Sequence, residues 1–517
     1  CGAAAWLIAS KAVPWANGAK ARTRVDVYAP AMGHGEAVEK VTRQRAEAMA
    51  SRLIEADHWR KGMSPGYPLG LNIVDNTSMY TSWEDMAIVL AGPRSGKSLC
   101  YAIPAVLSAP GPCLATSNKG DILDVTAPIR RLDHPNGRIW TFDPERIADP
   151  NRKSAPWVWD LIASVQSIAD AKRIADCWRY ASGQPQTGGD DFFPGTAAQQ
   201  LADYLFAAHL GGRSVSDVFR WCSNERDTSP ADILSEYPRY AGIASRVSSV
   251  IALTPETRSG VFGSLQTMVA FLADPEIIDW IDPHRDTEGN IDERRGLFDP
   301  YEFATSEDTL YLLSAQGRPS TALTASLTAV VAFTAFQRAQ SEFADNNRRL
   351  PVPLCCVLDE AANICRWPEL ADVYSYFGSA GIPIMTIWQN PDQGKAAFGE
   401  TNFGSLFNNA NITVYLGGIK DAKFLGEISQ LVGQREIVRG SVNIDGTGRR
   451  SVNNSIQKEN ILDVSDLTEW PVGRALLLAS QSRAQIVKTL PWTGNRQWAD
   501  ALAQAKAKAR DEQRKAA

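Results

Sequence analysis

The stretch 91–98 has the residue types that bind nucleotide phosphates. It reads AGPRSGKS and fits the phosphate-loop pattern G-x-x-x-x-G-K-[ST], with Ala91 in place of the first glycine. Apolar runs precede it at 86–90 and follow it at 99–103. This order predicts a strand, a loop and a helix, the context that distinguishes a phosphate loop from a Gly/Ser turn before a core helix.

The loop positions have physical roles in phosphate binding. Backbone N–H groups at a helix N-terminus face the β- and γ-phosphates, and Gly96 lets the backbone approach them because a Cβ would intrude. Lys97 would reach the β- and γ-oxygens, and the Ser98 hydroxyl would bind Mg²⁺. The predicted nucleotide-binding residues are Gly92, Pro93, Arg94, Ser95, Gly96, Lys97, Ser98 and Leu99.

A second apolar run, 354–358, ends in the acidic pair Asp359 and Glu360. Asp359 would hold Mg²⁺ through water, with the Ser98 hydroxyl on the same ion. Glu360 is the natural general base to polarise an attacking water. Two acids at a strand end are not rare alone, but together with a phosphate loop they predict an ATP and Mg²⁺ site that hydrolyses the nucleotide.

Gln389 follows the apolar run 382–388, which is predicted to be the neighbouring strand. Its amide can sense the γ-phosphate or position water, and the competing interpretation is a merely hydrophilic strand end. The predicted catalytic residues are therefore Lys97, Glu360 and Gln389, and the predicted metal ligands are Ser98 and Asp359.

Strands that alternate with helices must position these side chains. Such an order predicts a mostly parallel sheet whose ligand lies at the carboxyl ends of the strands. The predicted strands are 86–90, 112–116, 138–142, 309–313, 354–358, 382–388, 411–416 and 474–478. Between 165 and 280 the apolar spacing becomes helical instead, at 168–180, 195–210, 215–222, 229–253 and 258–272. The predicted fold class is α/β with an inserted all-α domain.

The remaining segments have simpler patterns. An amphipathic helix is expected at 36–59, a strand pair before residue 84, and a long buried helix at 320–342. Polar or glycine-rich connections are expected at 183–189 and 282–295, and 440–460 should form a mobile loop or a hairpin. The tail from 496 should be a helix with six basic and three acidic residues, which a solvated face explains.

Composition is that of a globular protein. The 517 residues are 44% hydrophobic and 21% charged, and the net charge of −5 shows no overall basic character, although a ring or channel can concentrate positive charge locally. The eight cysteines contain no C-x-x-C pair, which argues against zinc and favours reduced thiols of a cytosolic domain. The adjacent Cys355 and Cys356 should point to opposite faces of their strand.

The chain begins with Cys1 rather than methionine, and residues 1–9 are apolar before the basic Lys11, Lys20, Arg22 and Arg24. Nine residues cannot span a bilayer. We interpret them as the end of a transmembrane helix with a positive cytoplasmic flank; a mature lipoprotein cysteine is the alternative.

Four segments resemble the TraG/TraD-like coupling ATPases of type IV secretion and conjugation. They are SNKGDILDVT (117–126), TFDPE (141–145), LDEAANI (358–364) and IWQNPDQ (387–393). The stretch 191–197 resembles the start of that family's all-α domain, and the Pro-x-Gly-x-Ala-Leu sequence at 471–476 resembles its last strands. The resemblance extends from about 64 to 495.

This resemblance implies a RecA-like motor that forms homo-hexameric rings on the cytoplasmic side of the inner membrane, anchored by an N-terminal segment. Such motors hydrolyse ATP and bring relaxase-bound single-stranded DNA or protein effectors to the secretion channel. The expected organisation is a membrane-proximal segment (1–63), a RecA-like domain in two parts (64–164 and 299–495), an all-α insert (165–298) and a basic C-terminal helix (496–517).

One departure from the family pattern affects hydrolysis. Many members have an arginine shortly before the strand that ends in glutamine, and 377–381 here contains none. A cation supplied by a neighbouring subunit is worth several kcal/mol in the transition state. Arg366 and Arg435 are the candidate replacements; otherwise hydrolysis is weak or needs a partner.

Two other functions compete with the export motor. A FtsK/HerA-like translocase of double-stranded DNA would carry a winged-helix module at its C-terminus, whereas only a short helix is expected after 495. A docking platform that binds nucleotide with little hydrolysis is disfavoured by Glu360 and favoured by the absent arginine.

Overall fold

The computed structural model describes residues 22–60, 62–183, 192–283, 295–318, 320–444 and 450–516. The apolar segment 1–9 lies outside these ranges, as do most of the predicted connections 183–189 and 282–295.

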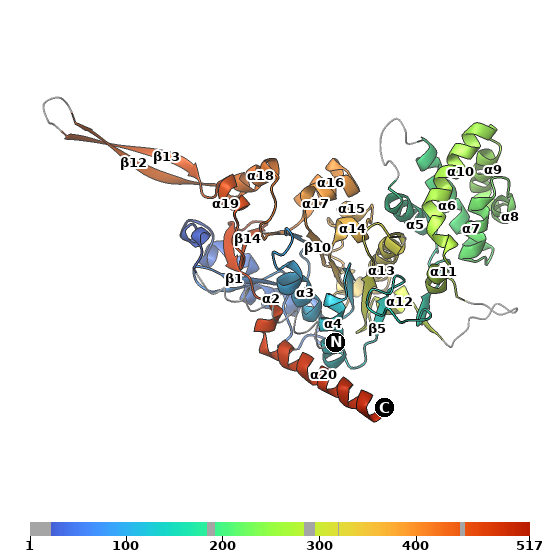
Figure 1. Ribbon diagram of the computed structural model, residues 1–517, viewed down its shortest axis with the longest axis horizontal. Coiled ribbons are helices and arrows are strands. Elements are labelled where there is room, and N and C mark those ends of the chain that lie inside the picture. The colour runs from blue at the N-terminus through green and yellow to red at the C-terminus, as the bar shows by residue number, and fades with distance from the viewer. Residues whose placement is uncertain are drawn as a thin grey trace.

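Within the described residues, eleven strands form one sheet in the order β2-β1-β15-β14-β11-β3-β10-β9-β4-β8-β5 (Figure 1). Neighbours from β11 to β5 are parallel, and those from β2 to β11 are antiparallel. The strands are β1 Pro68–Asn72, β2 Ser78–Tyr80, β3 Ala87–Leu90, β4 Cys113–Ser117, β5 Ile139–Phe142, β8 Thr309–Leu313, β9 Cys355–Leu358, β10 Ile384–Trp388, β11 Ile412–Tyr415, β14 Arg474–Ala479 and β15 Gln485–Lys488. The predicted α/β class with a mostly parallel sheet is confirmed.

Both faces of the central strands are buried, which explains their continuous apolar runs. In β3, Ile88 and Leu90 join the hydrophobic core on one face, and Val89 joins the core on the other. Cys356 and Cys355 divide between the same two cores, as predicted from their adjacency. All the described cysteines are buried and unpaired.

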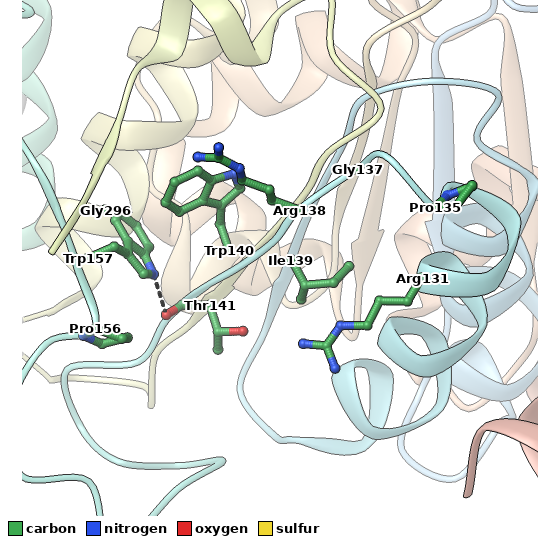
Figure 2. A pocket seen from close by; sticks show the side chains of 10 residues that line it. All are labelled: Arg131, Pro135, Gly137, Arg138, Ile139, Trp140, Thr141, Pro156, Trp157 and Gly296. Carbon is green, nitrogen blue, oxygen red and sulfur yellow. Dashed lines mark hydrogen bonds between the residues drawn. The ribbon is translucent and has the colours of Figure 1, made fainter. Parts of the chain in front are cut away.

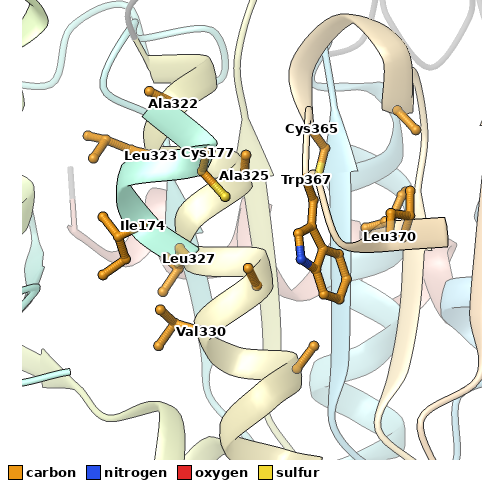
Figure 3. Packing of buried hydrophobic residues seen from close by; sticks show 14 of the residues in the cluster. Ile174, Cys177, Ala322, Leu323, Ala325, Leu327, Val330, Cys365, Trp367 and Leu370 are labelled. Atoms are coloured by element: carbon orange, nitrogen blue, oxygen red, sulfur yellow. The ribbon is translucent and has the colours of Figure 1, made fainter. Parts of the chain in front are cut away.

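Helix α13 (Ser320–Glu342) is a core element. It is long and apolar enough to cross a membrane, but 78% of its most apolar window is buried inside the protein. Figure 3 shows its Leu323 and Leu327 near Ile174 and Cys177 of α5, with the segment around Trp367 close by. The helix predicted at 320–342 therefore forms with the predicted bounds, as a buried helix.

Other helices cover the sheet. Those on the side of α13 include α12 Pro300–Phe303, α14 Ala361–Ile364 and α15 Leu370–Val373, and the opposite core is covered by α3 Ile103–Ser108 and α4 Asp121–Asp133. Further helices are α16 Pro391–Phe398, α17 Glu400–Asn409, α18 Ala422–Val432, α19 Val464–Thr468 and α20 Arg496–Ala516. Helix α20 packs on α4.

A group of helices without strands lies to one side of the sheet (Figure 1). It contains α5 Ile168–Ala181, α6 Phe192–Leu210, α7 Val215–Ser223, α8 Ser229–Ser235, α9 Ala241–Ile251, α10 Pro255–Val269 and α11 Pro275–Ile281. This supports an all-α insert, whose limits at 165 and 298 stay a prediction. In the sequence the group lies between the two strands of a short parallel pair, β6 Trp157–Trp159 and β7 Gly296–Phe298, that the sequence pattern did not indicate.

Two predicted helices are wrong in extent. The segment 229–253 is split into α8 and α9 by a 3₁₀ turn at Pro238–Tyr240, since proline offers no N–H to continue the helix. The segment 36–59 contains a 3₁₀ helix, Gly35–Val41, followed by α2 Arg43–Leu53. Thr42 separates them because its hydroxyl caps α2 by accepting from the Arg45 N–H at 3.3 Å.

The predicted loop or hairpin at 440–460 is a hairpin, and it begins earlier than expected. Strands β12 (Gln434–Ile444) and β13 (Arg450–Asn460) pair antiparallel along their whole length. Figure 1 shows this hairpin projecting away from the rest of the chain.

A buried ion pair fixes the N-terminal segment to the sheet. The Arg474 guanidinium on β14 donates to both carboxylate oxygens of Asp26, at 2.7 and 2.8 Å, and the side chains are only 2% and 6% exposed. Burial raises the pKa of Asp26, but hydrogen bonds from Arg474 and Thr23 outweigh it, so the pKa lies below its usual value. Asp26 is therefore held ionised against Arg474.

Replacing Asp26 with alanine should lower the free energy of unfolding by about 3–5 kcal/mol, because the buried Arg474 would lose the carboxylate that it contacts with two nitrogens. Equilibrium urea unfolding measures this. Arg24→Ala is the matched control: its contacts with Asp466 and Glu469 are exposed, so it should cost less than about 1 kcal/mol. Equally small losses in both variants would contradict the role of the pair.

Candidate nucleotide site

The phosphate loop lies between β3 and a π-helical turn, Ser98–Ala102, that leads into α3. Strand neighbours hold its first residues, since Ala91 N–H donates to the Trp388 carbonyl and Gly92 N–H to the Gly417 carbonyl, both at 2.9 Å. A Cβ on Gly92 would lie 2.5 Å from the Gly418 carbonyl oxygen. Gly92 is thus required by backbone packing.

The rest of the loop has the turned backbone that directs N–H groups inward. Arg94 and Gly96 adopt positive φ values of 63° and 91°. The Ser95 hydroxyl donates to the Gly92 carbonyl at 2.7 Å, which closes the turn. The Cys100 N–H then donates to Gly96 at 2.9 Å and begins the helix. This is the strand–loop–helix arrangement that binds anions at a helix N-terminus.

The two predicted halves of the site meet in space. Strand β9 lies between β10 and β4, and it delivers Asp359 and Glu360 to the same sheet edge as the loop. The Lys97 ammonium lies 3.5 Å from Asp359 Oδ1 and contacts Glu360 Oε1 directly. Both carboxylate side chains are only 4% exposed. A single lysine therefore faces two buried acids.

Two amides hold the Glu360 carboxylate in place. Gln389 Nε2 donates to Oε1, and Asn363 Nδ2 donates to Oε2 at 2.9 Å. The backbone of Glu360 has a left-handed φ of 56°, which is uncommon for a residue other than glycine and concentrates at functional sites. The sequence prediction included Gln389 but not Asn363. The signal available was its spacing of three residues after Glu360, on the first turn of α14.

Asp359 has a strongly shifted pKa. Burial raises it to about 6, against the attraction of Lys97 and with a further rise from the negative charge of Glu360. Strand β4 fixes the backbone here, because the Thr116 hydroxyl donates to the Asp359 carbonyl at 2.9 Å. The site therefore holds a carboxylate that lacks enough positive charge around it.

The negative charge of Asp359 and Glu360 exceeds the positive charge of Lys97, and this excess favours binding of a divalent cation. Ser98 and Asp359 offer the oxygen ligands that Mg²⁺ prefers. Among the described residues there is no cluster of three or more His, Cys, Asp or Glu side chains able to hold a metal. A magnesium ion here would depend on phosphate oxygens for its other ligands, as is usual at phosphate-loop sites.

The candidate replacement arginines are held elsewhere in the chain. Arg366 donates to the Ala362 carbonyl at 3.2 Å and to the Tyr180 carbonyl at 3.3 Å, and burial lowers its pKa. Arg435 lies over the ring of Tyr28, 5.4 Å from its centroid. These contacts hold both arginines away from Lys97, Asp359 and Glu360, so within the described chain neither completes the site.

Comparisons with known proteins bear on the family and the fold. Residues 353–472 match the family described as the TraM recognition site of TraD and TraG. No curated protein matches the chain.

Solved structures of the bacterial conjugative coupling protein TrwB share the fold. The sulphate complex of TrwBdeltaN70 is 15% identical, with a TM-score of 0.57 over 89% of this chain and 96% of that one. The complex with a non-hydrolysable GTP analogue is 14% identical, with a TM-score of 0.56 over the same shares. The complex with ADP and Mg²⁺ is 15% identical, with a TM-score of 0.54 over 79% of this chain and 85% of that one. The chain therefore resembles TraG/TraD proteins over residues 353–472 and has the fold of the conjugative coupling protein TrwB.

Proposed function

We propose that this chain is an ATP-hydrolysing motor of a conjugation or type IV secretion system. The observation that carries this is the contact of Lys97 with Asp359 and Glu360 at the carboxyl ends of β9 and its neighbours. It unites a phosphate-binding cation, a magnesium ligand and a general base. The TrwB structure that contains ADP and Mg²⁺ supports the same ligands here.

The proposed hydrolysis step uses these contacts. ATP phosphates would draw Lys97 away from Glu360, which frees Glu360 Oε1 to accept a proton from water. The resulting hydroxide attacks the γ-phosphorus, the bond to the β-phosphate oxygen breaks, and ADP leaves. Gln389 and Asn363 keep the base oriented. Magnesium, when bound through Ser98 and Asp359, would neutralise phosphate charge.

The biological context extends the same proposal. The motor would deliver relaxase-bound single-stranded DNA or protein effectors to an inner-membrane channel from the cytoplasmic side, as a homo-hexamer. The match to a TraM recognition family favours contact with DNA-processing partners. A FtsK/HerA-like translocase of double-stranded DNA is the competing motor.

A docking platform with little hydrolysis is the second candidate. The arginine absent from 377–381 and the resting contact of Lys97 with Glu360 both favour a low rate in a single chain. ATPase rate with and without single-stranded DNA separates the two functions.

We expect ATPase rate per chain to rise with protein concentration and with added single-stranded DNA, since the absent cation must come from a neighbour. Light scattering measured in parallel should show growing mass. A monomer that hydrolyses ATP at an unstimulated, concentration-independent rate near ~10 s⁻¹ would rule out a trans-acting mechanism.

Lys97→Ala and Glu360→Gln should separate binding from chemistry. The first should abolish nucleotide binding or turnover, because the main cation for the γ-phosphate is lost. The second should keep ATP binding and lower the hydrolysis rate by at least ~10²-fold, because a carboxamide cannot accept the proton. Binding of a fluorescent ATP analogue and phosphate release measure the two steps. Unchanged hydrolysis in Glu360→Gln would place the base elsewhere.

Magnesium-dependent ATP binding should weaken as pH falls below about 6, because Asp359 must be ionised to bind the metal. Because only one proton binds to Asp359, the affinity should fall by at most ~10-fold per pH unit. Titrations between pH 5 and 8 measure it. The control variant Asp359→Asn should bind ATP more weakly and should lack this pH dependence. Any pH dependence that remains in it comes from protonation of ATP itself. An identical pH profile in both proteins would contradict the assignment.

A further inference from the structure

A cleft of about 670 Å³ borders the last strand of the sheet, far from the nucleotide site in strand order (Figure 2). Strand β5 pairs only with β8 in the described chain, so its other side is an open edge. The cleft is lined by this edge together with Arg131 of α4, Trp157 of β6 and Gly296 of β7. It lies outside the residues that match the TraM recognition family.

The register of β5 shows which backbone groups face the cleft. The Arg138 carbonyl accepts from the Thr309 N–H at 2.9 Å, and Ile139 is aligned with Thr309. Because backbone groups alternate sides along a strand, the N–H and C=O of Ile139 and Thr141 point away from β8. One of these four groups, the Thr141 carbonyl, accepts from Trp157 Nε1 at 3.1 Å. The others form a row of donors and acceptors that an added strand can use.

Two tryptophans make a rigid wall beside this row. Trp140 and Trp157 are only 8% and 4% exposed and meet edge to face, 5.5 Å apart. Trp140 Nε1 donates to the Asp308 carboxylate at 2.7 Å. Since the rings are buried, they offer no open face on which the bases of a single-stranded nucleic acid could stack. The cleft therefore suits a peptide better than a nucleic acid.

Two arginines give the cleft its charge. Arg131 and Arg138 are exposed, and neither forms an ion pair with any described residue. Arg138 lies over the Trp140 ring, 5.8 Å from its centroid, and Figure 2 shows Arg131 extending from α4 toward β5. The nearby Asp308 is already engaged by the Arg138 N–H and Trp140. The free positive charge favours acidic side chains on a partner, and it opposes pairing with β5 of a second copy, which brings the same arginines.

We propose that this cleft binds an extended acidic segment of another protein, which adds to the sheet as a strand beside β5. Its backbone would bond to Ile139 and Thr141, and its carboxylates would face Arg131 and Arg138. Main-chain hydrogen bonds supply affinity in this mode, and side chains supply specificity.

Fluorescence anisotropy with synthetic peptides tests the proposal on the whole chain. The probe is a labelled peptide about ten residues long, in which valine and glutamate alternate. The comparison probes replace glutamate with lysine, methylate alternate backbone nitrogens, or use a ten-nucleotide thymidine oligomer. The acidic peptide should bind at least ~10-fold more tightly than either peptide control, since both its charge and its backbone are recognised.

Variants place the binding at β5. Arg131→Glu should weaken the acidic peptide by ~10-fold or more, and Thr141→Pro should do the same by removing an outward N–H that β8 does not use. The matched control is Arg45→Glu on α2, an exposed arginine near β2 at the opposite end of the sheet, which should leave binding unchanged.

Several results would overturn the proposal. They are absence of peptide binding, equal affinity for the acidic and basic peptides, or equal loss in Arg131→Glu and Arg45→Glu. Tighter binding of the oligonucleotide that depends on Arg131 would assign the cleft to nucleic acid instead. Self-association lost in Arg131→Glu would assign it to a second copy. Circular dichroism and ATP binding of each variant identify any loss caused by misfolding.

Discussion

One lysine between two buried carboxylates is the constraint on which the candidate site depends. Lys97 forms ion pairs with both Asp359 and Glu360, and burial still leaves Asp359 with a raised pKa. A buried acid pair with one cation is incompletely compensated. A nucleotide that withdraws Lys97 must therefore bring other positive charge with it, and this links the affinity for phosphate to the affinity for a divalent cation.

The parallel sheet makes that contact possible between residues more than 260 positions apart in the sequence. Strands β3, β9 and β10 are neighbours or next neighbours, and all three run in the same direction. Their carboxyl ends therefore bring the phosphate loop, the acid pair and Gln389 to one edge. Gly92 lies against the Gly418 backbone, so even the far side of the loop is fixed by the segment after β11.

The sequence predicted most reliably what depends on long or continuous apolar patterns. Strand β8 and helix α13 have the predicted bounds, because β8 is wholly buried and α13 is buried through most of its length. The predicted helix bounds were wrong where a single residue, Thr42 or Pro238, interrupts the helix. The strands β6 and β7 were missed because each is only three residues long. The residues of the site were predicted by type and strand position. The three-residue spacing of Asn363 from Glu360 was the signal available for their contact, but the left-handed backbone at Glu360 was not indicated by the sequence.

The projecting hairpin has a mechanical consequence. Its strands are eleven residues long, so at about 3.3 Å per residue their far ends, Ile444 and Arg450, lie about 35 Å from the base. At the base, Arg435 lies over Tyr28, whose hydroxyl donates to Asp466 at 3.4 Å. Tyr28 is two residues from Asp26, which is tied to β14 by Arg474. A lever of this length turns a tilt of about 10° at the base into a displacement of about 6 Å at these far ends. Small rearrangements where the N-terminal segment meets the sheet are thus amplified at a distance.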